Sequence, residues 1–142
     1  MLMLESRTVE EVYDNRFYYK AGINNCLQRG GGDCTAEQVL DVVYEDRAAV
    51  LDVIENQEPL GFIVLSEGIM RYSGKHELSV DFAYIQGAKK TLALYDAVCA
   101  LGRELEFDRL TFGSDRKGWQ RYLKHTDFTA NARYYSKDFT YE

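Results

Sequence analysis

The chain has 142 residues and a formal net charge of −6, with 46% hydrophobic and 28% charged side chains. Its 11 tyrosines and 7 phenylalanines exclude a disordered chain, because disordered chains bury too little apolar surface to fold. The length suits one domain with a sizeable core, so residues 1–142 are expected to form a single domain.

Membrane and secretion signals are not expected in this sequence. No apolar run approaches the roughly 20 residues that a membrane-spanning helix needs. The apolar start at residues 1–4 is too short for a signal peptide and is followed at once by Glu5. Cys26, Cys34 and Cys99 are odd in number and scattered, which predicts buried free thiols in a reducing compartment. We therefore expect a cytoplasmic protein without membrane contact.

Acidic side chains are concentrated in the first part of the chain. Residues 1–60 carry twelve acidic and five basic side chains, whereas residues 61–142 carry eleven and twelve. A general nucleic-acid binder needs a basic face, so this distribution argues against one. It would suit a cationic partner, and a solvated acidic surface is the simpler explanation.

Two helices are predicted at the start of the chain. Thr8 and Glu11 have the spacing of a capping box, which predicts a helix from residue 8 to about residue 28. Its expected buried residues are Val12, Tyr13, Phe17, Ile23 and Leu27. Three glycines at residues 30–32 end it, and Thr35 with Gln38 opens a second, short helix that reaches residue 44.

The pattern then changes to that of strands. Residues 47–54 are apolar and β-branched, and residues 60–72 form a second run with Gly61 and Gly68 as candidate bulges. A turn at Ser73 and Gly74 leads back into a third strand over residues 76–85. Consecutive strands of this kind predict an antiparallel meander, with almost no strand before residue 47.

The third strand and the helix after it organise the rest of the fold. Leu78, Val80, Phe82 and Tyr84 alternate and are expected on one face of the strand. After a break at residues 86–88, a helix reaching about residue 106 has its predicted buried face at Leu92, Tyr95, Val98, Leu101, Gly102 and Leu105. A helical crossover of this kind predicts that a strand at residues 109–113 lies parallel to residues 76–85.

The chain is expected to close with a short helix at residues 115–124 and strands at residues 127–130 and 133–141. The predicted fold class is therefore α/β (α+β): one domain with a mixed, mostly antiparallel sheet flanked by helices.

The break before the central helix could bind an anion. Unpaired N–H groups and the helix dipole point the same way at a helix N-terminus, and Lys89 and Lys90 stand there. Strand, turn and helix units of this kind also occur as ordinary folding units without a ligand, and both interpretations stay open on geometry alone.

The order of elements resembles the GNAT superfamily of acyl-CoA N-acyltransferases. Its most specific part is the ending, in which Asp127-Phe128 and the run at residues 133–139 (RYYSKDF) are similar to the "GF…YYxK" ending of that superfamily. Residues 109–112 resemble the strand after the central helix. The tract at residues 114–119 (SDRKGW), with the opening of the chain, is similar to divergent GNAT-like proteins of tailed phages.

The resemblance implies acetyl-CoA as cofactor and a pyrophosphate site on a turn of the form Q/R-x-x-G-x-G/A. The residues of this turn, and hence the implied cofactor-binding residues, are Ile85, Gln86, Gly87, Ala88, Lys89, Lys90 and Thr91. Gln86 matches the first position, but Lys89 and Thr91 occupy the two positions that are small in the family. Small residues let backbone N–H groups approach the phosphates, so this departure puts cofactor binding in question.

The resemblance also implies a tyrosine that protonates the departing thiolate. Counting back from Phe128 puts Leu123 at that position. Tyr122, one residue earlier, is the candidate acid if the helix is reset by about 100°, and a packing aromatic is the alternative. For a general base, the third strand offers Glu77, Asp81 and His76, and the two carboxylates are expected opposite its apolar face. A solvated strand face is the alternative for these two carboxylates. The two histidines are far apart without nearby ligands, so no zinc site is expected.

Two functions are compatible with these residues. The first is an N-acetyltransferase that uses acyl-CoA and an amine substrate. The second is a catalytically silent bacteriophage structural or accessory protein of the same fold, located in the host cytoplasm or the virion, with protein partners instead. Either one could form a homo-oligomer.

Overall fold

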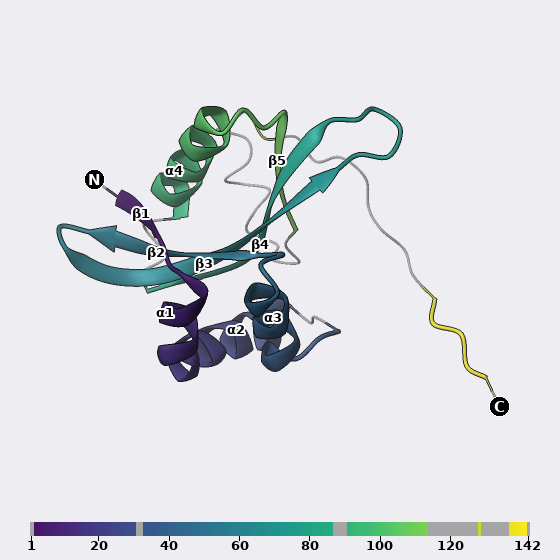
Figure 1. The fold of residues 1–142 in the computed structure, drawn as a ribbon, viewed down its shortest axis with the longest axis horizontal. Helices are drawn as coiled ribbons and strands as arrows, with labels where there is room; N and C mark the ends of the chain where they lie inside the picture. The colour runs from purple at the N-terminus through teal and green to yellow at the C-terminus, as the bar shows by residue number, and fades with distance from the viewer. Residues whose placement is uncertain (1, 31–32, 87–90, 114–127, 129–136, 142) are drawn as a thin grey trace.

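The computed structural model describes residues 2–30, 33–86, 91–113, 128 and 137–141. They form a sheet of five strands in the order β1-β2-β3-β4-β5. Helices α1, α2 and α3 cover one face of the sheet and α4 covers the other (Figure 1); we call these the α1–α3 face and the α4 face. The elements are β1 (Leu2–Ser6), α1 (Val9–Asp14), α2 (Arg16–Gly30), α3 (Ala36–Tyr44), β2 (Ala49–Glu55), β3 (Glu58–Ile69), β4 (His76–Ile85), α4 (Thr91–Glu104) and β5 (Arg109–Phe112).

The sheet topology confirms the predicted meander and crossover. Strands β2, β3 and β4 pair antiparallel in succession, and β5 lies parallel to β4 after the crossover through α4. The near absence of an earlier strand was wrong, because β1 pairs along its length with β2, from Leu2 opposite Glu55 to Ser6 opposite Leu51. Five residues that end in Glu5 and Ser6 carry little periodicity, so the partner strand defines this one.

The predicted first helix is divided in two at Asn15. This residue leaves the helical conformation (φ −110°, ψ 26°), and its side-chain amide donates a hydrogen bond to the Glu11 carbonyl at 3.0 Å. Tyr13 and Phe17 are 52% and 73% exposed instead of buried, whereas Val12, Tyr19 and Ile23 are buried. The three buried residues share one helical face on both sides of the break, and Tyr13 and Phe17 lie beside that face, where the prediction did not place them.

Both predicted capping boxes are confirmed. The Glu11 N–H donates to the Thr8 hydroxyl at 3.1 Å, and the Glu11 carboxylate accepts from the Thr8 N–H at 3.0 Å. Thr35 and Gln38 repeat the arrangement at 3.2 and 2.9 Å. Hydrogen bonds from Thr8 also hold the pKa of Glu11 below its usual value. Local chemistry therefore determines where α1 and α3 begin.

Of the two candidate bulges in β3, only one exists. Val53 pairs with Gly61 and Ile54 pairs with Pro59, so one residue of β3 is inserted beside Gly61. Gly68 pairs regularly with Glu77. A Cβ atom on Gly61 would lie 1.9 Å from the Tyr84 carbonyl oxygen, so glycine is required where β3 and β4 approach.

The buried face of α4 is partly as predicted. Tyr95 and Val98 are buried, whereas Leu105 is 57% exposed because it follows the end of the helix. Leu94, which the predicted face omitted, is 1% exposed. Leu101 is half-buried, and the side chain of Leu92 lies outside the described part of the structure.

The three cysteines form no disulfide, as predicted, but each is half-buried and not fully buried. Among the described residues, no helix combines the length and the apolar character needed to span a bilayer.

Candidate functional site

Strand β4 contains a bulge at Asp81. Leu65 of β3 pairs with Val80, and the next residue back, Val64, pairs with Phe82. Asp81 is therefore an inserted residue without its own partner in the ladder to β3. Bulges of this kind redirect side chains and are frequent beside active sites.

The bulge moves the second half of β4 onto the other face. Leu78 and Val80 pack in the cluster under α4, whereas Phe82 and Tyr84 pack with the cluster under α2 and α3. The predicted single face through all four residues is therefore wrong beyond Val80. One inserted residue reverses the alternation of every later side chain in the strand.

Asp81 lies at the end of the parallel ladder. The last pair between β4 and β5 in the described residues joins Val80 and Phe112, so Asp81 is the first residue of β4 beyond it. Its carboxylate is exposed and accepts a hydrogen bond from the Ser79 hydroxyl at 2.8 Å. Because Ser79 alternates with Val80, this contact places the carboxylate on the α1–α3 face.

Glu77, the other predicted base, lies at the opposite end of the ladder. It is half-buried and pairs with Gly68 on one side and Arg109 on the other. Glu77 and Asp81 are four positions apart in the sequence, which is about 13 Å along an extended strand. The two carboxylates therefore cannot serve one reacting group together, and only Asp81 stands where β4 loses its parallel partner.

The turn after β4 is held against β3. The Gln86 N–H donates to the Leu60 carbonyl at 2.9 Å, and Ile85 packs on the α4 face. Helix α4 begins at Thr91, and its first turn carries no acidic side chain. Of the predicted cofactor-binding residues, Gly87, Ala88, Lys89, Lys90 and the side chain of Thr91 lie outside the described residues.

The aromatic side chains of α4, β5 and the closing segment meet on the α4 face. The ring centroids of Tyr95 and Phe112 are 4.6 Å apart, and Phe128 lies 5.3 Å from Phe112 and 6.1 Å from Tyr95. Phe128 therefore packs beside the end of the β4–β5 ladder. Tyr122, the predicted acid, lies outside the described residues.

A polar network that the sequence analysis missed links β2, α2 and the segment after β1. The Asp52 carboxylate accepts from the Tyr19 hydroxyl at 2.9 Å and from the Arg7 guanidinium at 2.7 Å. Burial and the bond to Asp52 raise the pKa of Tyr19, so this phenol stays protonated and donates. A carboxylate at the centre of an apolar strand was the available signal, since a half-buried charge requires partners.

Aromatic rings cover the same region of the α1–α3 face. Phe62 contacts Tyr18, Tyr19 and Tyr84, with ring centroids 5.6, 4.9 and 5.7 Å away. Helix α2 lies so close to β3 that a Cβ atom on Gly22 would be 2.4 Å from the Phe62 ring. The sequence offered no signal for these contacts, because the residues come from three separate elements.

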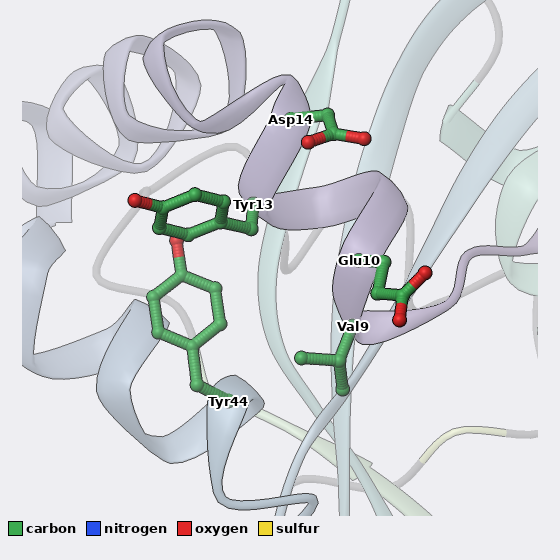
Figure 2. A pocket seen from close by; sticks show the side chains of 5 residues that line it. All are labelled: Val9, Glu10, Tyr13, Asp14 and Tyr44. Atoms are coloured by element: carbon green, nitrogen blue, oxygen red, sulfur yellow. The ribbon is translucent and has the colours of Figure 1, made fainter.

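An open cavity of about 420 Å³ lies between α1 and α3, lined by Val9, Glu10, Tyr13, Asp14 and Tyr44. Figure 2 shows the rings of Tyr13 and Tyr44 close together, 5.8 Å apart, with the carboxylates of Glu10 and Asp14 directed away from them. None of the predicted site residues lines it, so this cavity is a poor candidate for the reaction site.

A metal centre is not indicated either. The described part of the chain contains no group of three or more histidine, cysteine or carboxylate side chains that could hold a metal ion.

No protein-family profile matches the sequence, and neither does any curated protein. Solved structures do match the fold. A ribosomal-protein-alanine N-acetyltransferase from Brucella melitensis biovar Abortus 2308 superposes with a TM-score of 0.69 and 14% identity, over 99% of this chain and 100% of that one. An aminoglycoside acetyltransferase from an uncultured soil metagenomic sample, in complex with sisomicin, gives 0.67 and 13%, over 99% and 97%.

A GNAT family acetyltransferase from Staphylococcus aureus subsp. aureus USA300_TCH1516 gives a TM-score of 0.66 at 9% identity, over 97% of this chain and 98% of that one. At such identities the likeness is one of fold. It covers almost the whole chain. The chain therefore has the fold of the GNAT acetyltransferases.

Proposed function

We propose that this protein is an acyl-CoA-dependent N-acyltransferase that transfers an acetyl group to an amine. The observation that carries the proposal is the position of Asp81: a bulge places this carboxylate at the first residue of β4 beyond the parallel ladder. The fold shared with acetyltransferases supports it, since the neighbours span nearly all of the chain.

In the proposed reaction Asp81 acts as general base. Most amines are protonated at neutral pH and must lose a proton before the nitrogen can attack a carbonyl carbon. The Asp81 carboxylate, exposed and oriented by Ser79, accepts that proton directly or through a water molecule. Acetyl-CoA, when bound, supplies an activated thioester, and Tyr122 is proposed to return a proton to the sulfur.

The residues around the start of α4 are compatible with an anionic cofactor. A helix N-terminus favours negative charge, and no acidic side chain in the first turn of α4 opposes it. Lys89 and Lys90 precede this turn in the sequence and would add positive charge. We propose that the pyrophosphate of acetyl-CoA lies against the backbone of residues 87–90.

The alternative is a catalytically silent protein that uses the same fold to bind protein partners, as a bacteriophage structural or accessory component would. One observation favours it: Lys89 and Thr91 stand where glycines would let the backbone reach the phosphates. Loss of these close contacts would leave the fold intact and weaken the cofactor site.

Calorimetric titration with CoA separates the two functions. The unmodified chain is expected to bind weakly, and replacing Lys89 and Thr91 together by glycine should tighten binding if side-chain bulk is the obstacle. Weaker binding in that variant would mean that the lysine charge dominates. Acetyl transfer to a panel of amines, followed by mass spectrometry, tests catalysis directly. No heat and no transfer in either protein would establish the silent alternative.

A further inference from the structure

Strand β1 forms one edge of the sheet. In the described residues it pairs with β2 on one side, and no strand pairs with its other side. Figure 1 shows β1 at the margin of the sheet, near the N-terminus. Met3 is 65% exposed, and the Glu5 side chain is 54% exposed. An open edge of this kind can pair with another strand through its backbone.

The ladder to β2 determines which backbone groups of β1 face outward. The Arg7 N–H donates to the Val50 carbonyl at 3.0 Å, so Arg7 belongs to a hydrogen-bonded pair. Such pairs alternate along antiparallel strands, which turns the N–H and C=O groups of Met3 and Glu5 toward β2. The corresponding groups of Leu2, Leu4 and Ser6 therefore point away from the sheet.

We propose that β1 pairs antiparallel with β1 of a second copy of this chain. Only the residues whose N–H and C=O groups point away from β2 can form hydrogen-bonded pairs with the second copy. When Leu4 lies opposite Leu4 of the second copy, Leu2 meets Ser6 of the second copy and Ser6 meets Leu2. All three outward residues of each strand are then used, whereas a shift by two residues in either direction leaves one of them unpaired.

The side chains agree with this register. Leu2 and Leu4 pack on the α4 face in each copy, so Met3 and Glu5 point to the α1–α3 face. With Leu4 at the centre, Met3 of one copy lies opposite Glu5 of the other, and the two Glu5 carboxylates do not oppose each other. A two-fold axis at Leu4 keeps the same face of both sheets on the same side, which gives one continuous sheet with closed symmetry.

Charge substitutions at Met3 test the register. Met3→Lys would place an ammonium opposite Glu5 of the second copy, and Met3→Glu would place a carboxylate there, twice in each dimer. We expect Met3→Lys to lower the dimer dissociation constant by about 2- to 30-fold and Met3→Glu to raise it by a similar factor. Both effects should shrink at high salt. Sedimentation equilibrium over a concentration series measures them, with Glu104→Lys, an exposed charge change on α4, as the control.

A second pair of variants tests the backbone contact itself. Leu4→Pro removes an N–H that points outward and plays no part in the ladder to β2, so the fold should persist while dimerisation is lost. Leu4→Ala removes a comparable part of the side chain and keeps the N–H, so it should still dimerise; circular dichroism verifies that both variants are folded. A wild-type protein that stays monomeric at all concentrations, or dimers insensitive to the Met3 and Leu4→Pro changes, would overturn the proposal.

Discussion

On the α4 face of the sheet, the buried side chains are aliphatic or aromatic, whereas the α1–α3 face also holds a half-buried carboxylate with its guanidinium and phenol partners. The α4 face is built by a crossover helix that packs across β1 and β5. The α1–α3 face is built by three helices that are consecutive in the sequence. In the described residues, the α1–α3 face combines apolar packing with the Asp52, Tyr19 and Arg7 network, and the bulge of β4 presents Asp81 on that same face.

The difference arises from how each face satisfies polar groups. Asp52 is tolerated because Tyr19 and Arg7 both donate to it, which offsets the cost of removing its charge from water. Stability on the α4 face should therefore depend on packed volume. On the α1–α3 face, stability should depend on hydrogen bonds as well as on packed volume. Substitutions on each face can test this difference.

The largest expected effect is on catalysis. Asp81→Asn should lower kcat/KM for acetyl transfer by about 100- to 10,000-fold, because the amide cannot accept the proton of the ammonium. Glu77→Gln is the matched control, since Glu77 lies at the other end of the parallel ladder, and it should leave the rate near that of the wild type. Equal losses in both variants would show that neither carboxylate has a specific role as the base.

The next effect concerns volume on the α4 face. Leu94 is 1% exposed, so Leu94→Ala should reduce the free energy of unfolding by about 2–5 kcal/mol through the cavity that it leaves. Leu105→Ala should change it by less than about 0.5 kcal/mol, because that side chain is 57% exposed. Urea denaturation measures both. Similar losses in the two variants would mean that the buried face of α4 is misplaced.

Tyr19→Phe tests the polar network on the α1–α3 face. Losing the hydrogen bond to Asp52 should cost about 1.5–3 kcal/mol, whereas Tyr18→Phe, which removes a hydroxyl without a hydrogen bond among the described residues, should cost much less. The pKa of Tyr19 is raised by burial and by Asp52, so the folded state keeps the phenol protonated above pH 10, where the unfolded chain ionises.

The pH dependence has a definite sign. The contribution of Tyr19 to stability should be fully present below about pH 9 and should be lost as the pH rises above 10, since the unfolded state releases the proton first. Tyr19→Phe should reduce the steepness of the fall in stability. Tyr18 and Tyr44, whose pKa values are also raised by burial, account for the part that remains. If stability falls as steeply with pH in Tyr19→Phe as in the wild type, Tyr19 does not contribute to the loss of stability at alkaline pH.

The smallest effect tests the approach of α2 to the sheet. Gly22→Ala places a methyl group against the Phe62 ring and should cost about 1–3 kcal/mol. Combining it with Phe62→Leu should give less than the sum of the two single losses, because the smaller side chain leaves room for the methyl group. Gly30→Ala should hardly change the free energy of unfolding, because nothing lies within 4 Å of a Cβ atom placed on Gly30. Strict additivity would show that the two residues do not compete for space.

Local signals account for the parts that the sequence predicted correctly. Thr8 and Thr35 start their helices through hydrogen bonds within four residues, and the tract from residue 76 to residue 112 shows strand, helix and strand periods in turn. The crossover rule then requires a parallel β5. The first helix was predicted as one piece, but α1 ends at Asp14 and α2 begins at Arg16, and Phe17, predicted as buried, is exposed.

The sequence alone did not predict β1, the break at Asn15 or the absence of a strand in the described residues 137–141. It was sufficient for the sheet topology from β2 to β5 and for naming Asp81 and Glu77 as candidate bases. The choice between these two positions required the tertiary structure, because the register of β4 against β3 and β5 puts a bulge at Asp81 and leaves Glu77 inside the ladder. The existence of β1 and the meeting of Asp52, Tyr19 and Arg7 required it too. The polar network joins residues 33 to 45 positions apart in the chain, and the β1–β2 pairs join residues 45 to 53 positions apart, which no local period or motif encodes.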